Sequence, residues 1–448
     1  MLKRVLVANR GEIAVRIIRS CREMGIETVA IYAEEDTDAL HTQLADQAIC
    51  IGRGDVRKSY LNISNVISAA LLTGVDGVHP GYGFLSENAT FARTLQNVGL
   101  VFIGPEADLI DRMGDKARAR QTMMEAGVPV VPGSAGTIEH MKDALEEAQR
   151  IGFPVLVKAA SGGGGRGMRI SLDEADFQEA FSQARSEAEI AFGDGSVYIE
   201  KFVQKPRHVE VQILADHYGN VIHLGERDCS MQRRNQKVVE EAPAPGLTAE
   251  VRAGLHEAAV KAAQFVNYRS AGTLEFLLAP DGNFYFIEMN TRVQVEHPVS
   301  ELITGVDIIA EQIRIASGEP LQYRQEDICF RGHAMECRIN AEDPTRNFMP
   351  SPGLIEELHL PGGFGVRVDG AIYQGLTIPS RFDSLLAKLI VHGKTRDEAI
   401  ARMRRALSEF VITGPKTNIE FQLKLTGLKE FREGQIHTGL ILEKNWSE

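Results

Sequence analysis

Residues 272–297, GTLEFLLAPDGNFYFIEMNTRVQVEH, decide the fold in the middle of this chain. Apolar and polar residues alternate on both sides of Asp281-Gly282, a pattern typical of a β-hairpin with a tight turn. A two-residue turn at that point makes Glu275 and Glu288 direct cross-strand partners. Their Cβ atoms would lie ~4.5–5.5 Å apart, where two like charges destabilise a sheet. The opposed acids therefore predict a bound cation, and two carboxylates beside phosphate oxygens suit Mg²⁺.

The polar row continues beyond Glu288. If the strand runs on, its period of two places further polar residues on the same face: Asn290, Arg292, Gln294 and Glu296. An alternative is an ordinary solvated strand, with Val293 and Val295 facing the core. A solvated strand gains nothing from opposing two glutamates, so we favour a metal and phosphate site.

The composition is that of a globular protein with about two to four domains, since 44% of the 448 residues are hydrophobic and 25% are charged. Five cysteines without a C-x-x-C pair indicate neither a disulfide framework nor a zinc ribbon, which fits a reducing cytoplasm. The first residues, MLKRVLVANRGE, are too interrupted for a signal peptide, and no stretch reaches the ~18 apolar residues of a membrane span. We therefore expect a cytoplasmic protein that does not bind membranes. A formal charge of −12 argues against an extended nucleic-acid surface.

Strand-like and helix-like segments alternate over residues 3–113, which predicts a parallel α/β sheet. Its first turn, residues 9–12, lacks the G-x-G-x-x-G of dinucleotide-binding folds, so a Rossmann-type cofactor is not expected. Near the other end of the chain, residues 383–393 read as a strand. Thr395 and Glu398 predict a capping box for the helix that follows.

A glycine run lies within PVLVKAASGGGGRGMRI, residues 154–170. Strand-like sequence stands on both sides of the run, which is therefore predicted to be a loop joining two strands. Its backbone N–H groups can cradle phosphate oxygens, and Lys158 would add a point charge. The alternative is a mobile surface hairpin. A P-loop is absent, because Lys388 stands where the first glycine is needed before Gly393-Lys394-Thr395.

Motifs along the whole chain resemble the biotin carboxylase family, the ATP-grasp component of acetyl-CoA carboxylase. They are ANRGEIAVRIIR, HPGYGFLSEN, MGDK, KAASGGGGRGMR, YIEKFV, RHVEVQI, ERDCSMQRR, NFYFIEMNTRVQVEHPVSE and GHAMECRINAED. The resemblance implies a multidomain α/β and α+β fold: an N-terminal parallel α/β domain over residues 1–114, an ATP-grasp domain over 115–330 with a mobile lid at about 131–203, and a C-terminal α+β domain over 331–448. It also implies that ATP and bicarbonate are used to carboxylate N1 of biotin through carboxyphosphate.

The resemblance implies ATP contacts along much of the chain. Lys116 and Lys158 would hold phosphates, and Gly164 and Gly165 would close over them. Further contacts would come from Glu200, Lys201, Val203, His208, Asn235, Glu275 and Glu288. The chain departs from the family at Asn235, where histidine is frequent, and at residues 380–382, Ser-Arg-Phe.

The same resemblance assigns chemistry to the polar row. The metal ligands, for Mg²⁺ or Mn²⁺, would be Glu275, Glu288 and Asn290, in agreement with the argument from the hairpin. Bicarbonate and biotin would be bound by Arg292, Gln294, the Val295 backbone, Lys237 and Arg338. Glu296 would be the general base. Without the resemblance, a lone residue such as His208 or Lys237 is more often a surface or hydrogen-bonded residue than a ligand.

Biotin would arrive on another chain, since the sequence has no A/V-M-K-M biotinylation motif. The expected partners are a biotin carboxyl carrier protein and carboxyltransferase subunits, with acetyl-CoA as the leading acceptor and a pyruvate or other acyl-CoA carboxylase as the alternative. A homodimer is expected because Arg16, Arg19 and Glu23 share a helix face and match the family's dimer contact, although a solvated helix with local ion pairs also explains them. More distant alternatives are another ATP-grasp ligase, such as a carbamoyl-phosphate synthetase module, and a non-catalytic nucleotide-binding regulator.

Overall fold

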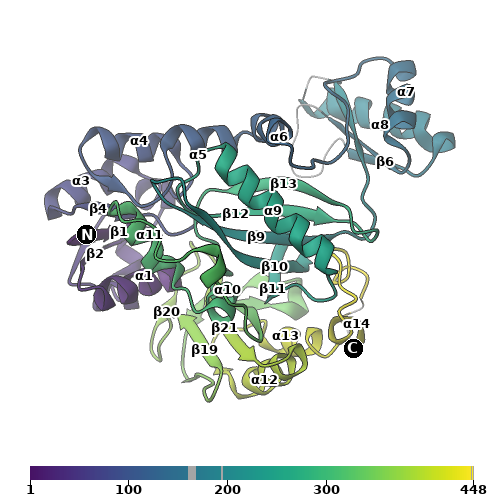
Figure 1. Ribbon diagram of the computed structural model, residues 1–448. Helices are drawn as coiled ribbons and strands as arrows, with labels where there is room; N and C mark the ends of the chain where they lie inside the picture. Colours follow the sequence, from purple (N-terminus) through teal and green to yellow (C-terminus); the bar gives the residue numbers. More distant parts are fainter. Residues whose placement is uncertain (160–167, 193–194, 445, 447–448) are drawn as a thin grey trace. The chain divides into compact units, whose positions relative to one another are not determined.

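The computed structural model describes residues 1–159, 168–192, 195–444 and 446. Within that part, the chain forms two compact units. The first comprises Met1–Val128, Arg207–Phe276 and Glu288–Glu448, and the second comprises Pro129–Pro206 and Leu277–Ile287. Figure 1 shows the helices and strands of both units. In the described residues, no helix is both long enough and apolar enough to cross a membrane.

The first sheet of the first unit is parallel throughout and has the strand order β3-β2-β1-β4-β5. Its strands are β1 (Arg4–Val7), β2 (Glu27–Tyr32), β3 (Gln47–Cys50), β4 (Gly77–His79) and β5 (Val101–Phe102). The helices of this region are α1 (Gly11–Glu23), α2 (Leu40–Leu44), α3 (Ile63–Thr73), α4 (Ala89–Asn97), α5 (Ala107–Gly114) and α6 (Lys116–Glu125). The predicted parallel α/β sheet is confirmed.

Helix α1 packs on this sheet through an apolar stripe. Ile13, Ile17 and Cys21 recur at four-residue intervals and are buried in the core that includes β1. The helix follows directly from β1, so its first turns also carry two charged residues into the protein, Glu12 and Arg16. Buried charges need partners, and these two take part in the network described below.

The second sheet has eight strands in the order β13-β12-β9-β10-β11-β14-β21-β19. They are β9 (Arg207–Ala215), β10 (Val221–Arg233), β11 (Gln236–Ala242), β12 (Ser270–Leu278), β13 (Phe284–Asn290), β14 (His333–Asn340), β19 (Val366–Gly370) and β21 (Leu385–Gly393). From β9 to β19, each strand pairs with its neighbour in antiparallel fashion. The strand predicted at residues 383–393 is confirmed as β21.

Helices pack on both faces of this sheet. They are α9 (Ala249–Phe265), α10 (His297–Thr304), α11 (Ile308–Ala316), α12 (Arg396–Glu409), α13 (Ile419–Leu425) and α14 (Lys429–Arg432). On β14, Met335 and Cys337 enter the core that contains α12, whereas Ala334 enters the core that contains α10. Glu336 and Arg338 continue the alternation from Ala334 and therefore lie on the α10 side.

Short elements complete the first unit. The short strands are β15 (Glu342–Asp343), β16 (Met349–Pro350), β17 (Gly353–Leu354), β18 (Leu358–His359), β20 (Thr377–Ile378) and β22 (Val411–Ile412). The 3-10 helices are η1 (Glu34–Asp36), η2 (Val56–Lys58), η3 (Gln325–Asp327) and η4 (Pro344–Arg346).

The predicted capping box of α12 is half formed. Thr395 Oγ1 accepts a hydrogen bond from Glu398 N at 3.3 Å. The reciprocal bond goes elsewhere, because Glu398 Oε2 accepts from Lys394 N at 2.9 Å. The carboxylate thus reaches one residue further back than predicted.

The second compact unit is built on a three-stranded antiparallel sheet of order β7-β6-β8. Its strands are β6 (Val155–Ala159), β7 (Met168–Ser171) and β8 (Val197–Lys201), and its helices are α7 (Met141–Ile151) and α8 (Glu174–Phe192). Phe177 and Phe181 of α8 pack on Val155 and Val157 of β6. β6 ends at Ala159 and β7 begins at Met168, so strands stand on both sides of the glycine run, as predicted, while the run itself lies outside the described residues.

The hairpin between β12 and β13 has a three-residue loop in place of the predicted two-residue turn. Ala279 N donates to Asn283 O at 2.7 Å, and Gly282 N donates to Ala279 O at 3.0 Å. With Gly282 at φ +89°, this is a three-residue loop that ends in a glycine bulge. A ladder continued from this turn pairs Glu275 with Ile287. The predicted two-residue turn is therefore wrong, and the hairpin no longer argues for direct opposition of Glu275 and Glu288.

The polar row also departs from a continuous strand. β13 ends at Asn290, and Glu296 is the N-cap residue of α10, with φ −83° and ψ 13°. Pro298 lies in the first turn of that helix, where its missing N–H removes no helical hydrogen bond. The prediction that one rigid strand extends to Glu296 is wrong.

Candidate active site

The ammonium group of Lys237, on β11, lies among three buried carboxylates. It donates to Glu210 Oε2 at 2.6 Å, to Glu296 Oε1 at 2.7 Å and to Glu275 Oε1 at 2.9 Å. The Lys237 side chain is only 13% exposed, so its charge persists because these acids neutralise it. Burial would lower the pKa of Lys237, but Glu210 and Glu296 outweigh burial and raise that pKa well above its usual value. The structure thus brings together the predicted residues Lys237, Glu275 and Glu296.

Glu275, on β12, is contacted at both carboxylate oxygens. Asn290 Nδ2 and Gln294 Nε2 donate to Oε1 at 2.9 and 3.0 Å, and His208 Nε2 lies 2.9 Å from Oε2. Burial would raise the pKa of Glu275, but Lys237 and His208 hold it well below its usual range. Glu275 is therefore ionised and links the start of the polar row to Lys237.

Arg292 joins the same hydrogen-bond network. It donates from Nη1 to Gln294 Oε1 at 2.8 Å, from Nη2 to Asn290 Oδ1 at 2.7 Å and from Nε to Glu87 Oε2 at 2.8 Å. Asn290, Arg292 and Gln294 therefore converge although they do not share one strand. Glu87 was missed in the sequence analysis, although it lies in the motif HPGYGFLSEN.

Arg338 links Glu296 to a further buried acid, Glu240. Its Nη2 donates to Glu296 Oε2 at 2.9 Å, and its Nε donates to Glu240 Oε1 at 2.7 Å. Burial would raise the pKa of Glu296, but Lys237 and Arg338 lower it well below its usual range. Glu296 can accept a proton, but it is a weak base while these two cations hold it.

A fully buried arginine, Arg227, supports Glu210 from the side opposite Lys237. Its Nε donates to Glu210 Oε1 at 2.6 Å. Its other nitrogens donate to Gln212 Oε1, Ser300 Oγ and Thr273 Oγ1 at 2.7, 3.0 and 3.1 Å. Sequence reasoning missed both residues, yet Glu210 shares the strand face of His208 in RHVEVQI, and that alternation was a usable signal.

Lys388 fixes the backbone of the polar row. It is fully buried on β21, and its Nζ donates to Val295 O at 2.8 Å and lies 3.2 Å from Glu12 Oε2. Glu12 also accepts a hydrogen bond from Tyr82. Val295 is the residue whose backbone is expected to contact bicarbonate, so Lys388 positions that backbone from the β21 side.

Glu288, the second predicted metal ligand, lies at the edge of this network. Its side chain is 39% exposed, and its Oε2 is 3.7 Å from Lys116 Nζ. Glu275, Glu288 and Asn290 together offer the oxygen donors that Mg²⁺ prefers, so the donor set fits this cation. Because Glu275 Oε1 already accepts bonds from Lys237, Asn290 and Gln294, a cation bound to that oxygen must displace at least one donor.

The predicted lid residues belong to the second compact unit. Lys158 Nζ donates to Glu200 Oε2 at 2.6 Å, so two residues expected to contact ATP form an ion pair with each other. Lys201 Nζ donates to the backbone carbonyls of Gly152 and Phe153 at 2.8 and 2.9 Å. Val203 follows β8 in a half-buried loop. Gly164 and Gly165 lie outside the described residues.

Asn235 occupies a tight turn between β10 and β11. Asn235 and Arg234 have φ values of +62° and +50°, as in a two-residue hairpin loop of the left-handed type. Asparagine adopts this conformation more readily than most residues. The departure from the family at this position therefore suits the turn.

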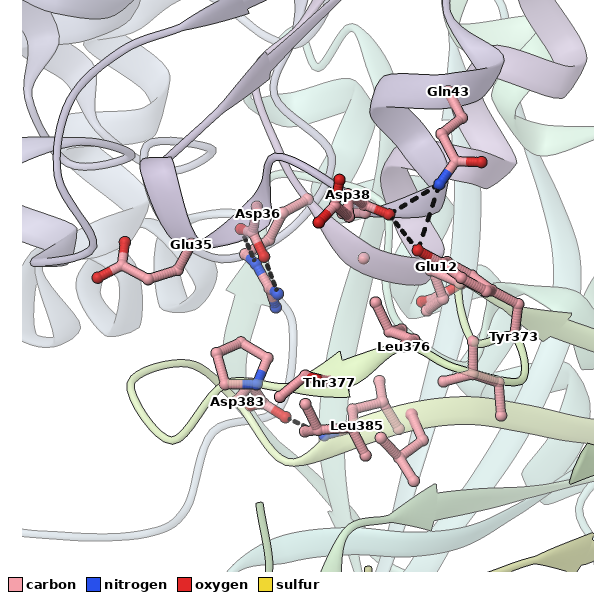
Figure 2. A pocket seen from close by; sticks show the side chains of 18 of the residues that line it. Glu12, Glu35, Asp36, Asp38, Gln43, Tyr373, Leu376, Thr377, Asp383 and Leu385 are labelled. Atoms are coloured by element: carbon pink, nitrogen blue, oxygen red, sulfur yellow. Dashed lines mark hydrogen bonds and ion pairs between the residues drawn. The ribbon is translucent and has the colours of Figure 1, made fainter. Parts of the chain in front are cut away.

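The second departure from the family, at residues 380–382, lies beside a separate cavity of about 280 Å³ (Figure 2). In the cavity wall, Asp36 accepts two hydrogen bonds of 2.7 Å from Arg10. The Arg10 guanidinium stands 4.2 Å from the ring centre of Phe382. Among the described residues, the lining of this cavity includes Glu12 but none of the predicted site residues.

Comparison with known proteins places this network in a family. Family models match three successive parts of the chain: biotin carboxylase, N-terminal domain, over residues 1–110; carbamoyl-phosphate synthase L chain, ATP binding domain, over 115–324; and biotin carboxylase C-terminal domain over 336–443. Biotin carboxylase 1 of Bacillus subtilis (strain 168) is 57% identical over 442 residues, which is 98% of each chain. The chain belongs to the biotin carboxylase family. Biotin carboxylase of Haemophilus influenzae is 55% identical over 435 residues, 97% of each chain.

Solved structures of biotin carboxylases have the same fold. The biotin carboxylase subunit of a pyruvate carboxylase has a TM-score of 0.92 at 53% identity, covering 99% of this chain and 98% of that one. The biotin carboxylase domain dimer of Hydrogenobacter thermophilus 2-oxoglutarate carboxylase, in complex with MgADP, ADP and bicarbonate, has a TM-score of 0.89 at 51% identity and full coverage of both chains. The predicted multidomain α/β and α+β fold is confirmed, and the chain is an ATP-dependent carboxylating ligase.

The helix face expected at a dimer contact is only partly free. Arg16 is buried, and its Nη2 donates to Glu301 Oε1 and Asp307 Oδ1, both at 2.8 Å. Arg19 and Glu23 are exposed. Arg16 therefore neutralises acids of its own chain, and a dimer contact through these three residues stays a prediction.

Proposed function

We propose that this biotin carboxylase uses ATP and bicarbonate to carboxylate N1 of biotin on a separate carrier protein, with Glu296 as the general base. The observation that supports this assignment is the position of Lys237, which hydrogen-bonds to both Glu275 and Glu296. Through these contacts a phosphate and metal region and a bicarbonate region share one network.

In the first step, Glu296 takes the proton of bicarbonate, and the resulting oxyanion attacks the γ-phosphorus of ATP. The bond to the ADP oxygen breaks, which yields carboxyphosphate and ADP. Arg292 and the Val295 backbone hold the anion, and Lys237 offsets the negative charge of the phosphates. Lys237 and Arg338 must turn partly from Glu296 to the substrates, since Glu296 becomes more basic as they leave.

Mg²⁺ would be held by Glu275, Glu288 and Asn290, and it would neutralise negative charge on the phosphates of ATP. Lys116 and Lys158 would add point charges. Glu200, Lys201, Val203, His208 and Asn235 would complete the nucleotide site with Gly164 and Gly165. The proposed domains remain 1–114, 115–330 and 331–448, with a lid at about 131–203.

Arg338 serves the second step. Carboxyphosphate breaks into CO₂ and phosphate, phosphate takes the N1 proton of biotin, and N1 attacks CO₂. Protonation of Glu296 in the first step removes the negative charge that Arg338 contacts at 2.9 Å. The freed guanidinium nitrogen can then stabilise the ureido oxygen of biotin as it gains negative charge.

The acceptor of the carboxyl group is a finer proposal. We favour acetyl-CoA, with a biotin carboxyl carrier protein, carboxyltransferase subunits, a homodimer and a cytoplasmic location. Pyruvate or another acceptor remains the alternative. The biotin carboxylase subunit of a pyruvate carboxylase and the biotin carboxylase domain of a 2-oxoglutarate carboxylase are 53% and 51% identical to this chain, close to the 57% of Biotin carboxylase 1 of Bacillus subtilis. Identification of the carrier that copurifies with the chain tests the choice.

The activity is tested with radiolabelled bicarbonate, ATP, Mg²⁺ and free biotin or a purified carrier. We expect ATP-dependent label on biotin. Binding of MgATP without any label transfer would refute the proposal. Glu357→Gln is the control for a glutamate-to-glutamine substitution. Glu357 is exposed and is not one of the proposed site residues, so this variant should preserve the transfer.

A further inference from the structure

Glu240 and Glu336 are buried acids that face each other behind Arg338. They are direct partners in the antiparallel pairing of β11 with β14, and both side chains are fully buried. Directly opposed residues have Cβ atoms only ~4.5–5.5 Å apart. Two ionised carboxylates in such positions would repel each other strongly.

The hydrogen bonding of both carboxylates is incomplete. Arg338 Nε donates to Glu240 Oε1 at 2.7 Å. In the described structure, Glu240 Oε2 and both carboxylate oxygens of Glu336 have no hydrogen-bond partner. A buried acceptor left without a donor is costly, and one proton between the two acids would supply the missing donor.

The surrounding charges do not replace that proton. The charged and titratable groups on the elements around this face are Lys388 of β21; Arg367 and Asp369 of β19; Glu296, His297 and Glu301 at α10; Glu12 and Arg16 of α1; Cys229 of β10; and Lys237 of β11. The Lys237 ammonium group donates to Glu210, Glu275 and Glu296. Lys388 contacts Val295 and Glu12, and Arg367 contacts Asp369 and Glu301. These cations are therefore engaged with other acceptors.

We propose that Glu240 and Glu336 share one proton, which Glu336 carries and donates to Glu240 Oε2, so that the pair presents a single negative charge to Arg338. Glu336 is then a positioning residue that acts on Arg338 through Glu240. Burial raises the pKa of Glu336 well above its usual value and that of Glu240 to about 7, in agreement with this assignment. The inference deepens the proposed function, since it concerns the residue assigned to biotin activation.

The charge of the pair decides how Arg338 is shared. With one negative charge, Glu240 balances Glu296 at the other end of the guanidinium. Loss of the shared proton would place two negative charges on one side and draw Arg338 away from biotin. We therefore expect the KM for biotin to rise on the alkaline side of the pH profile.

Two variants of Glu336 test the proposal. Glu336→Gln keeps a donor for Glu240 Oε2 that does not titrate, so it should retain the kcat of the wild type and lose the alkaline rise in KM for biotin. Glu336→Met removes the donor and should raise KM for biotin about tenfold, as expected for one buried hydrogen bond. A Gln variant with the same alkaline rise as the wild type would overturn the proposal.

Infrared difference spectra give a readout that does not depend on turnover or on the stability of the Met variant. The wild type minus Glu336→Gln spectrum should contain the C=O stretch of a protonated carboxylic acid. Glu241→Gln is the matched control, because Glu241 is the next residue on β11, is buried, and is held ionised by His333 and Arg396, which lower its pKa despite burial. Its spectrum should lose only a carboxylate band. Absence of the acid band for Glu336 overturns this inference, whereas failure of label transfer by the wild type overturns the proposed function.

Discussion

Lys237 Nζ lies 2.7 Å from Glu296 Oε1, and this contact keeps the proposed base ionised but weakly basic. The same ammonium contacts Glu275 at 2.9 Å. Movement of Lys237 toward substrate phosphates would therefore make Glu296 a stronger base at the time when bicarbonate is bound. Substrate binding and base strength are linked through one side chain.

Glu296→Gln should separate nucleotide binding from catalysis. Glutamine retains the size and hydrogen-bonding capacity of the side chain but cannot act as the base, so carboxylation should fall by ~10²–10⁴-fold. Calorimetric titration should give nearly unchanged MgATP affinity. Near-normal label transfer by this variant would contradict the assignment of Glu296 as the base.

Glu288→Gln should have a different effect. The change removes one of the carboxylates proposed to hold Mg²⁺, and Glu288 makes only a 3.7 Å contact with Lys116. Turnover should slow, and the Mg²⁺ concentration needed for half-maximal rate should rise, with partial recovery at high Mg²⁺. The rate of each protein is plotted against Mg²⁺ concentration and scaled to its own maximum. If the curves of the variant and the wild type then superimpose, Glu288 is not a ligand.

Lys237→Met should destabilise the protein as well as inactivate it. The change leaves Glu210, Glu275 and Glu296 without their shared counter-charge, and removal of one partner of a buried ion pair costs ~3–5 kcal/mol. Denaturant unfolding measures the loss. Adding Glu210→Gln should restore part of the stability but none of the activity. If the changes in unfolding free energy of the two single variants add up to that of the double variant, Lys237 and Glu210 are not coupled.

The acid pair predicts a pH dependence of stability with a definite sign. A folded-state pKa raised above the unfolded value means that stability is full below the unfolded pKa and is lost as pH rises towards the folded pKa. Between about pH 5 and pH 7, the unfolding free energy of the wild type should therefore fall relative to that of Glu336→Gln, by up to ~1.4 kcal/mol per pH unit. Parallel curves for the two proteins from denaturant unfolding would contradict the raised pKa.

Much of this architecture could be predicted locally. Alternating apolar segments were sufficient for the parallel sheet, and the strand-like flanks of the glycine run were sufficient for β6 and β7. The hairpin register could not be predicted because the loop contains Pro280 as well as Asp281-Gly282, and one added residue changes every cross-strand pair. The end of β13 was missed because the start of α10 overrides the alternation beyond Asn290.

The residues of the site could likewise be predicted only in part from the sequence. The polar row contained the groups that converge on Glu275, but their convergence depends on bends between Asn290 and Glu296 that alternation does not contain. The buried positions of Arg227 and Glu240 could not be predicted from the sequence. A charged residue on a strand is usually exposed to solvent, and its burial is evident only when the neighbouring strand is known. Their roles arise only from strand pairing.

Lys388 joins residues from the regions matched by all three family models, since Glu12 precedes residue 110, Val295 lies within 115–324, and Lys388 lies within 336–443. A chimaera that takes its C-terminal region from another carboxylase must bring a lysine to this position and meet a glutamate at position 12. Without both, the grafted region would leave the Val295 carbonyl unanchored even if every piece folded. Exchange of parts between carboxylases is therefore limited by this three-way contact as well as by the choice of cut points.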